Sequence, residues 1–354
     1  MRTEPVPIPS VQIGPRRIAQ FVDQLFDFHA FVMKIFMLHS AQYFNDREGT
    51  AMTFRNRLVA SLVISFLLSA QAIVKSQVPK KPPTKSAPTQ KKPTMPLVAG
   101  TAVFAVQKYE DGVSIDPIVI FNKGQYIDPQ PDQTSAVSKQ VVAKYMRAGQ
   151  KHRLIFGGAE AGTITIKEAP TESQIGLTTS ATLQSSIKIG GAVMALATSS
   201  DTLGAKQNSR RAPTSEERTS MMDLMRATYK QKKVAPAAIA KATVNNITAI
   251  DLDGDGKVEL IGSFEIKDQT QNSQSLFLIA EMQNSQYQSS LTWYKKGDEG
   301  SFEDRSLIDV LDLDGDGIAE VFVVSSYYES TGFTIYKKVK GVWRSVYQGG
   351  LFGV

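Results

Sequence analysis

Two short acidic segments carry the residues in this sequence that are best suited to chemistry. The hexapeptide DLDGDG occurs at 251–256 and again at 312–317, an offset of 61 residues. In each copy Asp stands at positions 1, 3 and 5, Gly at positions 4 and 6, and Glu at position 9. Such a loop directs three carboxylates inward, and its glycines permit the tight bend. Because these carboxylates repel one another without a counter-cation, the pattern predicts a cation site in each copy.

Calcium is the cation that this set of ligands predicts. Ca²⁺ takes roughly six to eight oxygen ligands, whereas Mg²⁺ demands strict octahedral geometry and keeps its waters. A backbone carbonyl at position 7 typically completes a loop of this kind. The sequence therefore predicts two Ca²⁺ sites. Their ligands would be Asp251, Asp253, Asp255, the Lys257 carbonyl and Glu259 in the first copy, and Asp312, Asp314, Asp316, the Ile318 carbonyl and Glu320 in the second.

The elements that must position these ligands are strands. Each hexapeptide lies between two apolar runs rich in β-branched residues, so we expect an antiparallel hairpin with the carboxylates at its tip. An EF-hand needs a bidentate Glu at position 12 between two helices. Position 12 is Gly262 in one copy and Val323 in the other, which argues against an EF-hand.

These residues resemble the FG-GAP and VCBS-type repeats of bacterial extracytoplasmic proteins, whose hallmark is Asp-x-Asp-Gly-Asp-Gly-x-x-Asp/Glu between two strands. The resemblance covers Thr243–Val354 and implies calcium binding and propeller-type blades, but no particular activity. Two features depart from the family pattern. Position 9 is Glu where Asp is common, which makes coordination by Glu259 and Glu320 less secure than by the aspartates. Only two copies are visible, whereas a closed propeller needs at least about four blades.

The preceding region, 96–242, reads as short strands separated by Gly, Asp and Pro, with two helices. We expect one helix over Ser135–Ala148, ended by Gly149, and a second that begins at Thr214 with a capping box. The apolar stripe of the second helix is either core or a partner-binding face. Its members are Met221, Leu224, Met225, Thr228 and Tyr229. The predicted fold class is mainly β with minor α (α+β), built from antiparallel hairpins that resemble FG-GAP/VCBS blades and form either an incomplete propeller or no propeller.

The N-terminal 95 residues read as a leader and a linker. Residues 52–72 have the pattern of a secretory signal peptide: two Arg, an apolar run over 58–70, and Ala70-Gln71-Ala72, with cleavage expected after Ala72. The apolar run is too short for a stable transmembrane span, which needs about 20 residues. Residues 73–95 form a Lys/Pro-rich linker expected to be disordered, which could pass through a cell-wall polymer. If translation starts at Met52, residues 1–51 are a non-native extension; the alternative is a cytoplasmic segment before an uncleaved signal anchor.

The net charge of +6 gives no support for nucleic-acid binding. Residues 1–72 carry seven basic and five acidic residues, and 73–95 carry six Lys and no acid. The folded part, 96–354, therefore holds 27 basic and 29 acidic residues. A nucleic-acid interface would need a basic face on the fold.

No catalytic or cofactor-binding residue is predicted. The chain has no Cys, and removal of the leader leaves His152 as the only imidazole; its position between Lys151 and Arg153 suggests a surface residue. Aromatic residues gather near the C-terminus, where they form either core or a contact surface for carbohydrate or protein. We expect a secreted or periplasmic calcium-binding module with a binding or structural role. The alternatives are an extracytoplasmic hydrolase with structural calcium and a membrane-tethered surface protein.

Overall fold

The structure, a computed structural model, describes residues 98–131, 135–170, 176–205, 207–267, 273–298 and 301–353. The predicted extension, signal peptide and linker lie outside these residues. All described residues belong to one unit, Lys92–Val354. Every pairing between its strands is antiparallel and helices are the minor component, which confirms the predicted mainly β class.

The first sheet has seven strands in the order β1-β7-β4-β5-β6-β2-β3, and β1 also pairs with β2. Strand β1 shows how the sheet buries both faces, because successive side chains of a strand point to opposite sides. Its Phe104 and Val106 belong to one hydrophobic cluster, whereas Val103 and Ala105 belong to another. The strands are β1 (Thr101–Lys108), β2 (Val113–Asn122), β3 (Gln125–Ile127), β4 (Lys151–Phe156), β5 (Ala159–Ile166), β6 (Thr179–Gln184) and β7 (Ala195–Thr198).

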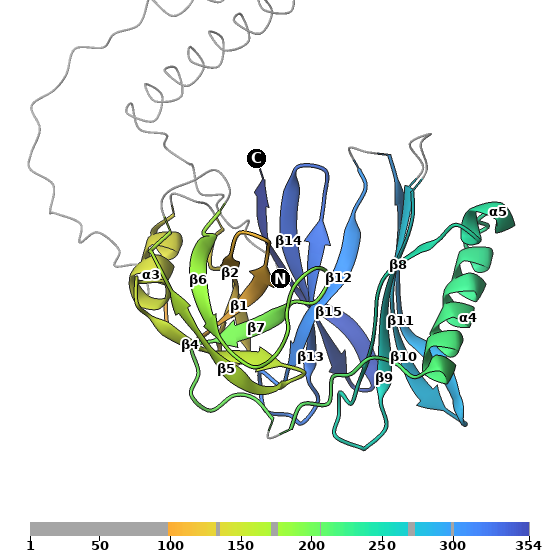
Figure 1. Ribbon diagram of the computed structural model, residues 1–354, viewed down its shortest axis with the longest axis horizontal. Coiled ribbons are helices and arrows are strands. Elements are labelled where there is room, and N and C mark those ends of the chain that lie inside the picture. Colours follow the sequence, from red (N-terminus) through yellow and green to blue (C-terminus); the bar gives the residue numbers. More distant parts are fainter. Residues whose placement is uncertain are drawn as a thin grey trace, which may run out of the picture. The chain divides into compact units, whose positions relative to one another are not determined.

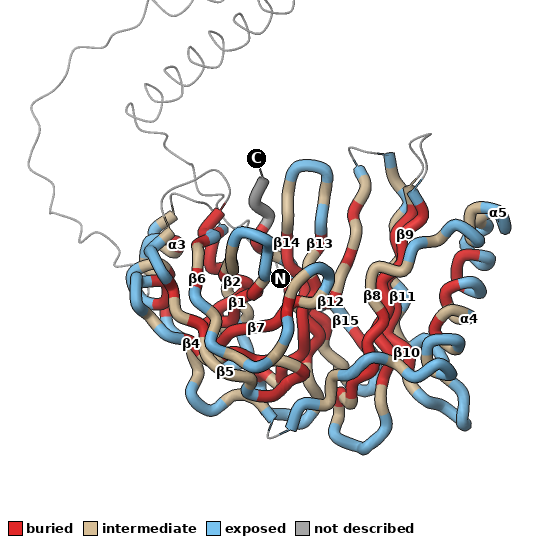
Figure 2. Tube along the Cα trace, in the orientation of Figure 1, coloured by how far each residue is buried: buried red, intermediate tan, exposed pale blue. Residues whose placement is uncertain are grey.

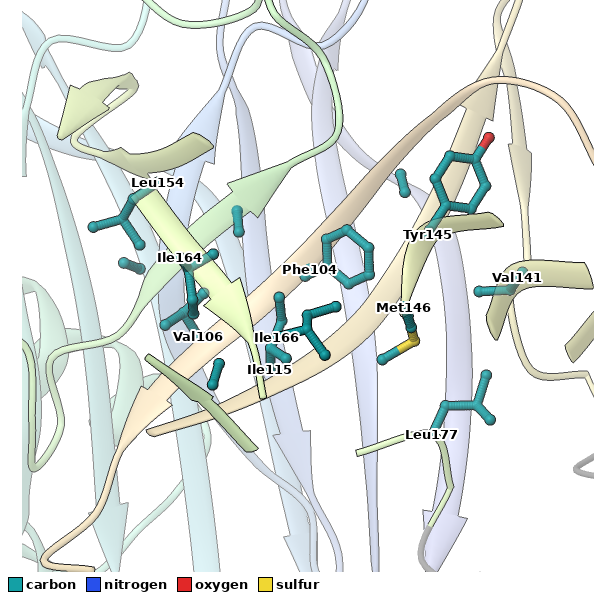
Figure 3. Packing of buried hydrophobic residues seen from close by; sticks show 14 of the residues in the cluster. Phe104, Val106, Ile115, Val141, Tyr145, Met146, Leu154, Ile164, Ile166 and Leu177 are labelled. Atoms are coloured by element: carbon teal, nitrogen blue, oxygen red, sulfur yellow. The ribbon is translucent and has the colours of Figure 1, made fainter. Parts of the chain in front are cut away.

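One face of this sheet packs on helix α3 (Ala136–Tyr145). Figure 3 shows Val141 and Tyr145 of the helix beside Phe104 and other buried side chains of the sheet. The Ser135 hydroxyl accepts a hydrogen bond from the Ser138 N–H at 3.1 Å and so caps the helix. The predicted C-terminal end was wrong. The helix ends at Tyr145, and the Gly149 N–H bonds to a strand carbonyl instead of a helix carbonyl.

Two further sheets each contain four strands that follow one another along the chain. One has the order β11-β10-β9-β8 and the other β12-β13-β14-β15. Both acidic hexapeptides lie in the first hairpin of their sheet, as predicted. The strands are β8 (Thr243–Ile250), β9 (Glu259–Ile266), β10 (Ser273–Gln283), β11 (Gln286–Gly297), β12 (Asp304–Leu311), β13 (Glu320–Ser326), β14 (Ser330–Val339) and β15 (Val342–Gly353).

The three sheets and the second helix form successive layers (Figure 1). The face of the seven-stranded sheet opposite α3 packs on β12–β15, through residues such as Leu196 and Phe322. The other face of β12–β15 packs on β8–β11, through residues such as Val323 and Phe277. Figure 2 shows the buried residues concentrated in the strands between these layers. The sheet β12–β15 is thus covered on both faces.

Helix α4 (Ser215–Gln231) covers the outer face of β8–β11, and the short helix α5 (Pro236–Ile239) follows it. The predicted capping box is present: the Thr214 hydroxyl accepts from the Glu217 N–H, and the Glu217 carboxylate accepts from the Thr214 N–H. Met221, Met225 and Tyr229 are buried against the sheet. The apolar stripe of this helix is therefore core.

Candidate metal centre

The two acidic loops have the same internal hydrogen bonds. In the first, the Asp251 carboxylate accepts from the N–H groups of Gly254 at 2.8 Å and Gly256 at 3.0 Å. In the second, Asp312 accepts from the corresponding glycines at the same two distances. All four glycines have a positive φ, between 72° and 89°, which L side chains rarely adopt. The spacing of Asp and Gly in the sequence thus produces one loop structure twice.

Each loop is closed by the Glu at position 9. Glu259 is buried, and its carboxylate accepts from the Leu252 N–H at 2.8 Å; Glu320 is fully buried and accepts from the Leu313 N–H at the same distance. Burial raises the pKa of Glu259 to about 7, against the hydrogen bond from Leu252. Burial likewise raises the pKa of Glu320 to about 7, against the hydrogen bonds from Leu313 and Lys337. A nearby cation would favour the ionised form of both groups.

The first loop brings three of its predicted ligands together. Carboxylate oxygens of Asp251, Asp253 and Asp255 lie within 4.8 Å of one another. Oxygens on opposite sides of a Ca²⁺ ion are about 5 Å apart, twice the usual Ca–O distance, so these three side chains can share one ion. Glu259 lies outside this group of three, although it closes the same loop.

The second loop gathers a different set, Asp312, Asp314 and Glu320, within the same 4.8 Å. Asp316 stands outside this set and accepts from the Ile318 N–H at 3.0 Å, as Asp255 does from the Lys257 N–H at 2.7 Å. The sequence therefore predicted which residues share each loop, but not which carboxylates meet most closely.

Lysines contact both loops, and the sequence pattern did not reveal two of them. In the first loop, the exposed Lys257 side chain pairs with Asp255 at 3.0 Å. Lys337 and Lys338, consecutive residues of β14, point to opposite sides of their sheet. Lys337 contacts three carboxylates of the second loop, at 2.6 to 3.0 Å. Lys338 reaches Asp253 of the first loop at 3.9 Å.

The two loops also contact each other. The Ala319 N–H of the second loop donates to the Leu252 carbonyl of the first at 2.7 Å. Leu252 and Ile318 belong to the hydrophobic cluster between the two four-stranded sheets. Trp343 of β15 donates its indole N–H to Glu281 of β10 at 2.7 Å. The loops therefore lie where the two sheets meet.

The structure corrects the expectation for His152, which is buried, not exposed. Its Nε2 lies 2.8 Å from the Tyr145 carbonyl, so Nε2 carries the proton and Nδ1, which has no partner, does not. Burial lowers the pKa of His152, against this hydrogen bond. The C-terminal aromatics are partly core: Phe333, Tyr336, Trp343 and Tyr347 are buried, whereas Tyr328 is exposed.

A buried ion pair was missed by the sequence analysis. Asp309 of β12 is fully buried, and its carboxylate lies 3.2 Å from the guanidinium of Arg210, whose side chain is 4% exposed. The Gly157 N–H donates to both carboxylate oxygens, at 2.9 and 3.1 Å. Gly157 belongs to the β4–β5 turn, which carries no phosphate-loop motif, so its amide serves an internal contact.

No known protein family matches this chain, and neither a curated protein nor a solved structure does. Among the described residues, no helix is long and apolar enough to cross a membrane. The function is therefore inferred from the two loops themselves.

Proposed function

We propose that this protein is a calcium-binding, β-rich module that acts outside the cytoplasm in a non-catalytic binding or structural role, with one Ca²⁺ in each acidic loop. The observation that carries the proposal is the repeated loop structure, in which the same hydrogen bonds gather oxygen ligands at two positions 61 residues apart. The clusters contain only oxygen ligands, which suits a hard cation such as Ca²⁺.

The arrangement of the sheets supports a structural role for the ion. Each loop joins two strands of its own sheet, and the loops touch at the junction between sheets. An ion held there would favour the packed state over the unfolded chain. At a free Ca²⁺ concentration ten times the Kd, one site adds about 1.4 kcal/mol to the free energy of unfolding. That corresponds to a rise of roughly 3–6 °C in the unfolding temperature.

The FG-GAP/VCBS-type blade is part of this proposal. Two features support it: each sheet is a meander of four consecutive antiparallel strands, and the two sheets pack face to face. The described residues contain two such sheets, fewer than a closed propeller requires. We infer an incomplete propeller of two blades, which is covered on one side by the seven-stranded sheet and on the other by α4.

The test compares thermal unfolding of the full chain in Ca²⁺, in Mg²⁺ and in EDTA, together with calorimetric titration of Ca²⁺. We expect Ca²⁺ alone to raise the unfolding temperature by several degrees. Asp253→Asn combined with Asp314→Asn should abolish the rise, because each substitution removes a carboxylate ligand. The loops should keep their shape, since the glycine N–H groups donate to Asp251 and Asp312 instead. Asp223→Asn, at an exposed position of α4, is the matched control. Equal unfolding temperatures in Ca²⁺ and EDTA, with no heat of Ca²⁺ binding, would overturn the proposal.

A further inference from the structure

Lys337 places an ammonium group against the carboxylates of the second loop. Its Nζ lies 2.8 Å from Asp314 Oδ1, 2.6 Å from Asp316 Oδ2 and 3.0 Å from Glu320 Oε1. An ammonium has three N–H donors, so these contacts use all of them. The Lys337 side chain is only 13% exposed. Two of its three partners, Asp314 and Glu320, belong to the closest carboxylate cluster of this loop.

The corresponding position beside the first loop carries the opposite charge. In β13 and β14, Val321 pairs with Tyr336; in β9 and β10, Leu260 pairs with Ala280. The next residue along β14 is Lys337, and the next along β10 is Glu281. The two hairpins thus share a register, but the position that holds an ammonium in one holds a carboxylate in the other.

The lysines near the first loop do not replace this ammonium. Lys257 pairs with Asp255 alone, and its side chain is 65% exposed. Lys338 lies 3.1 Å from Glu281 and 3.9 Å from Asp253, so it contacts Glu281 more closely than the loop. The carboxylate cluster of Asp251, Asp253 and Asp255 therefore has no ammonium bound to several of its members among the described residues.

We propose that Lys337 is a built-in counter-cation of the second loop, which competes with Ca²⁺ for Asp314, Asp316 and Glu320. This inference rests on the proposed function. A Ca²⁺ ion held by Asp314 and Glu320 would share these carboxylates with the ammonium and repel it, so calcium binding displaces Lys337. The two loops consequently fill in two steps, first 251–259 and then 312–320. Between the two steps the ammonium keeps the second loop closed.

The competition can be measured on the second loop alone. Asp253→Asn disables Ca²⁺ binding by the first loop. Calorimetric titration of Ca²⁺ into this full-length variant therefore measures binding to the second loop. Adding Lys337→Met removes the competing charge while keeping an unbranched side chain of similar reach. We expect the Kd for Ca²⁺ to fall by about tenfold or more, because no ammonium has to be displaced. Lys296→Met removes a positive charge from an exposed position and is the matched control.

Two further measurements separate competition from a general effect on folding. Lys337→Arg keeps the charge, so it should retain the weak affinity of the parent variant. In EDTA, Lys337→Met should lower the unfolding temperature, because the three carboxylates lose their counter-cation, whereas Lys296→Met should not. Ca²⁺ affinity that is the same with Lys337, with Arg and with Met would overturn this inference and leave the proposed function standing. An absence of Ca²⁺ binding in wild type and in every variant would overturn the proposed function itself.

Discussion

Asp309→Asn probes the buried ion pair between Asp309 of β12 and Arg210 of the segment that precedes α4. Asp309 is fully buried and Arg210 is 4% exposed. The guanidinium also donates to the carbonyls of Met194 at 3.1 Å and Ile308 at 3.0 Å, so it is fixed on both sides of the layer boundary. Burial raises the pKa of Asp309 to about 6, opposed by Arg210 and the Gly157 N–H. At pH 7.5 the carboxylate is therefore ionised, and the substitution leaves a buried guanidinium without its counter-charge.

Removing one partner of a buried pair costs about 3–5 kcal/mol. We expect this decrease in the free energy of unfolding, which corresponds to about 6–20 °C in the unfolding temperature. Urea unfolding followed by circular dichroism, at pH 7.5 with saturating Ca²⁺, measures it. Asp223→Asn, in the Arg226–Asp223 pair whose side chains are 56% and 66% exposed, should change the free energy by about 0.5 kcal/mol or less. A change below about 1 kcal/mol for Asp309→Asn would refute the reasoning.

A double variant tests the cause of the loss. Arg210→Met in the Asp309→Asn background removes the unpaired charge and keeps apolar volume over the Phe156 ring, from which the guanidinium carbon lies 4.7 Å. Because the uncompensated charge is the main penalty, the double variant should be more stable than Asp309→Asn alone. Additive losses would show instead that each side chain acts through its own separate contacts.

Two other predictions concern His152 and the leader. Burial lowers the pKa of His152, so at a pH below its ordinary pKa of about 6.5 the unfolded chain binds more protons than the folded one. The free energy of unfolding should therefore decrease as the pH is lowered, by up to about 1.4 kcal/mol per pH unit. His152→Gln should flatten that part of the pH profile, and identical profiles for wild type and variant would contradict the assignment. If residues 52–72 are a cleaved signal peptide, N-terminal sequencing of the exported protein should begin at Ile73. A chain that retains 52–72 would instead support the membrane-tethered alternative.

Features that depend on neighbours in sequence were predictable. The Asp251 carboxylate bonds to amides three and five residues away, and the Thr214 capping box spans three residues, so residue types and spacing contain the necessary information. The burial of His152 could also have been found. Its charged neighbours face away because strand side chains alternate, and His152 and Leu154 share a face that the pattern of β4 reveals.

Features that depend on how strands and layers assemble were not predictable. Lys337 meets Asp314 across 23 residues, through the antiparallel register of β13 and β14 that pairs Val321 with Tyr336. Asp309 meets Gly157 across 152 residues, through the packing of two sheets. Neither contact leaves a local signal, because β14 reads as an ordinary strand with two lysines and Asp309 reads as one more acid before an acidic loop.

The position of the loops determines what calcium could do in this protein. Asp253 of one sheet lies 3.9 Å from Lys338 of the other, and the Ala319 N–H bonds to the Leu252 carbonyl across the same boundary. On the proposed function, a cation in either loop would therefore act on the junction between sheets as well as on its own hairpin. On the proposed function, removal of calcium would weaken the packing of β8–β11 on β12–β15 before it unfolded either sheet. Lys337 would limit this weakening of the packing, because it would keep the second loop closed. The second loop would then stay ordered at the junction when the first loop loses its Ca²⁺.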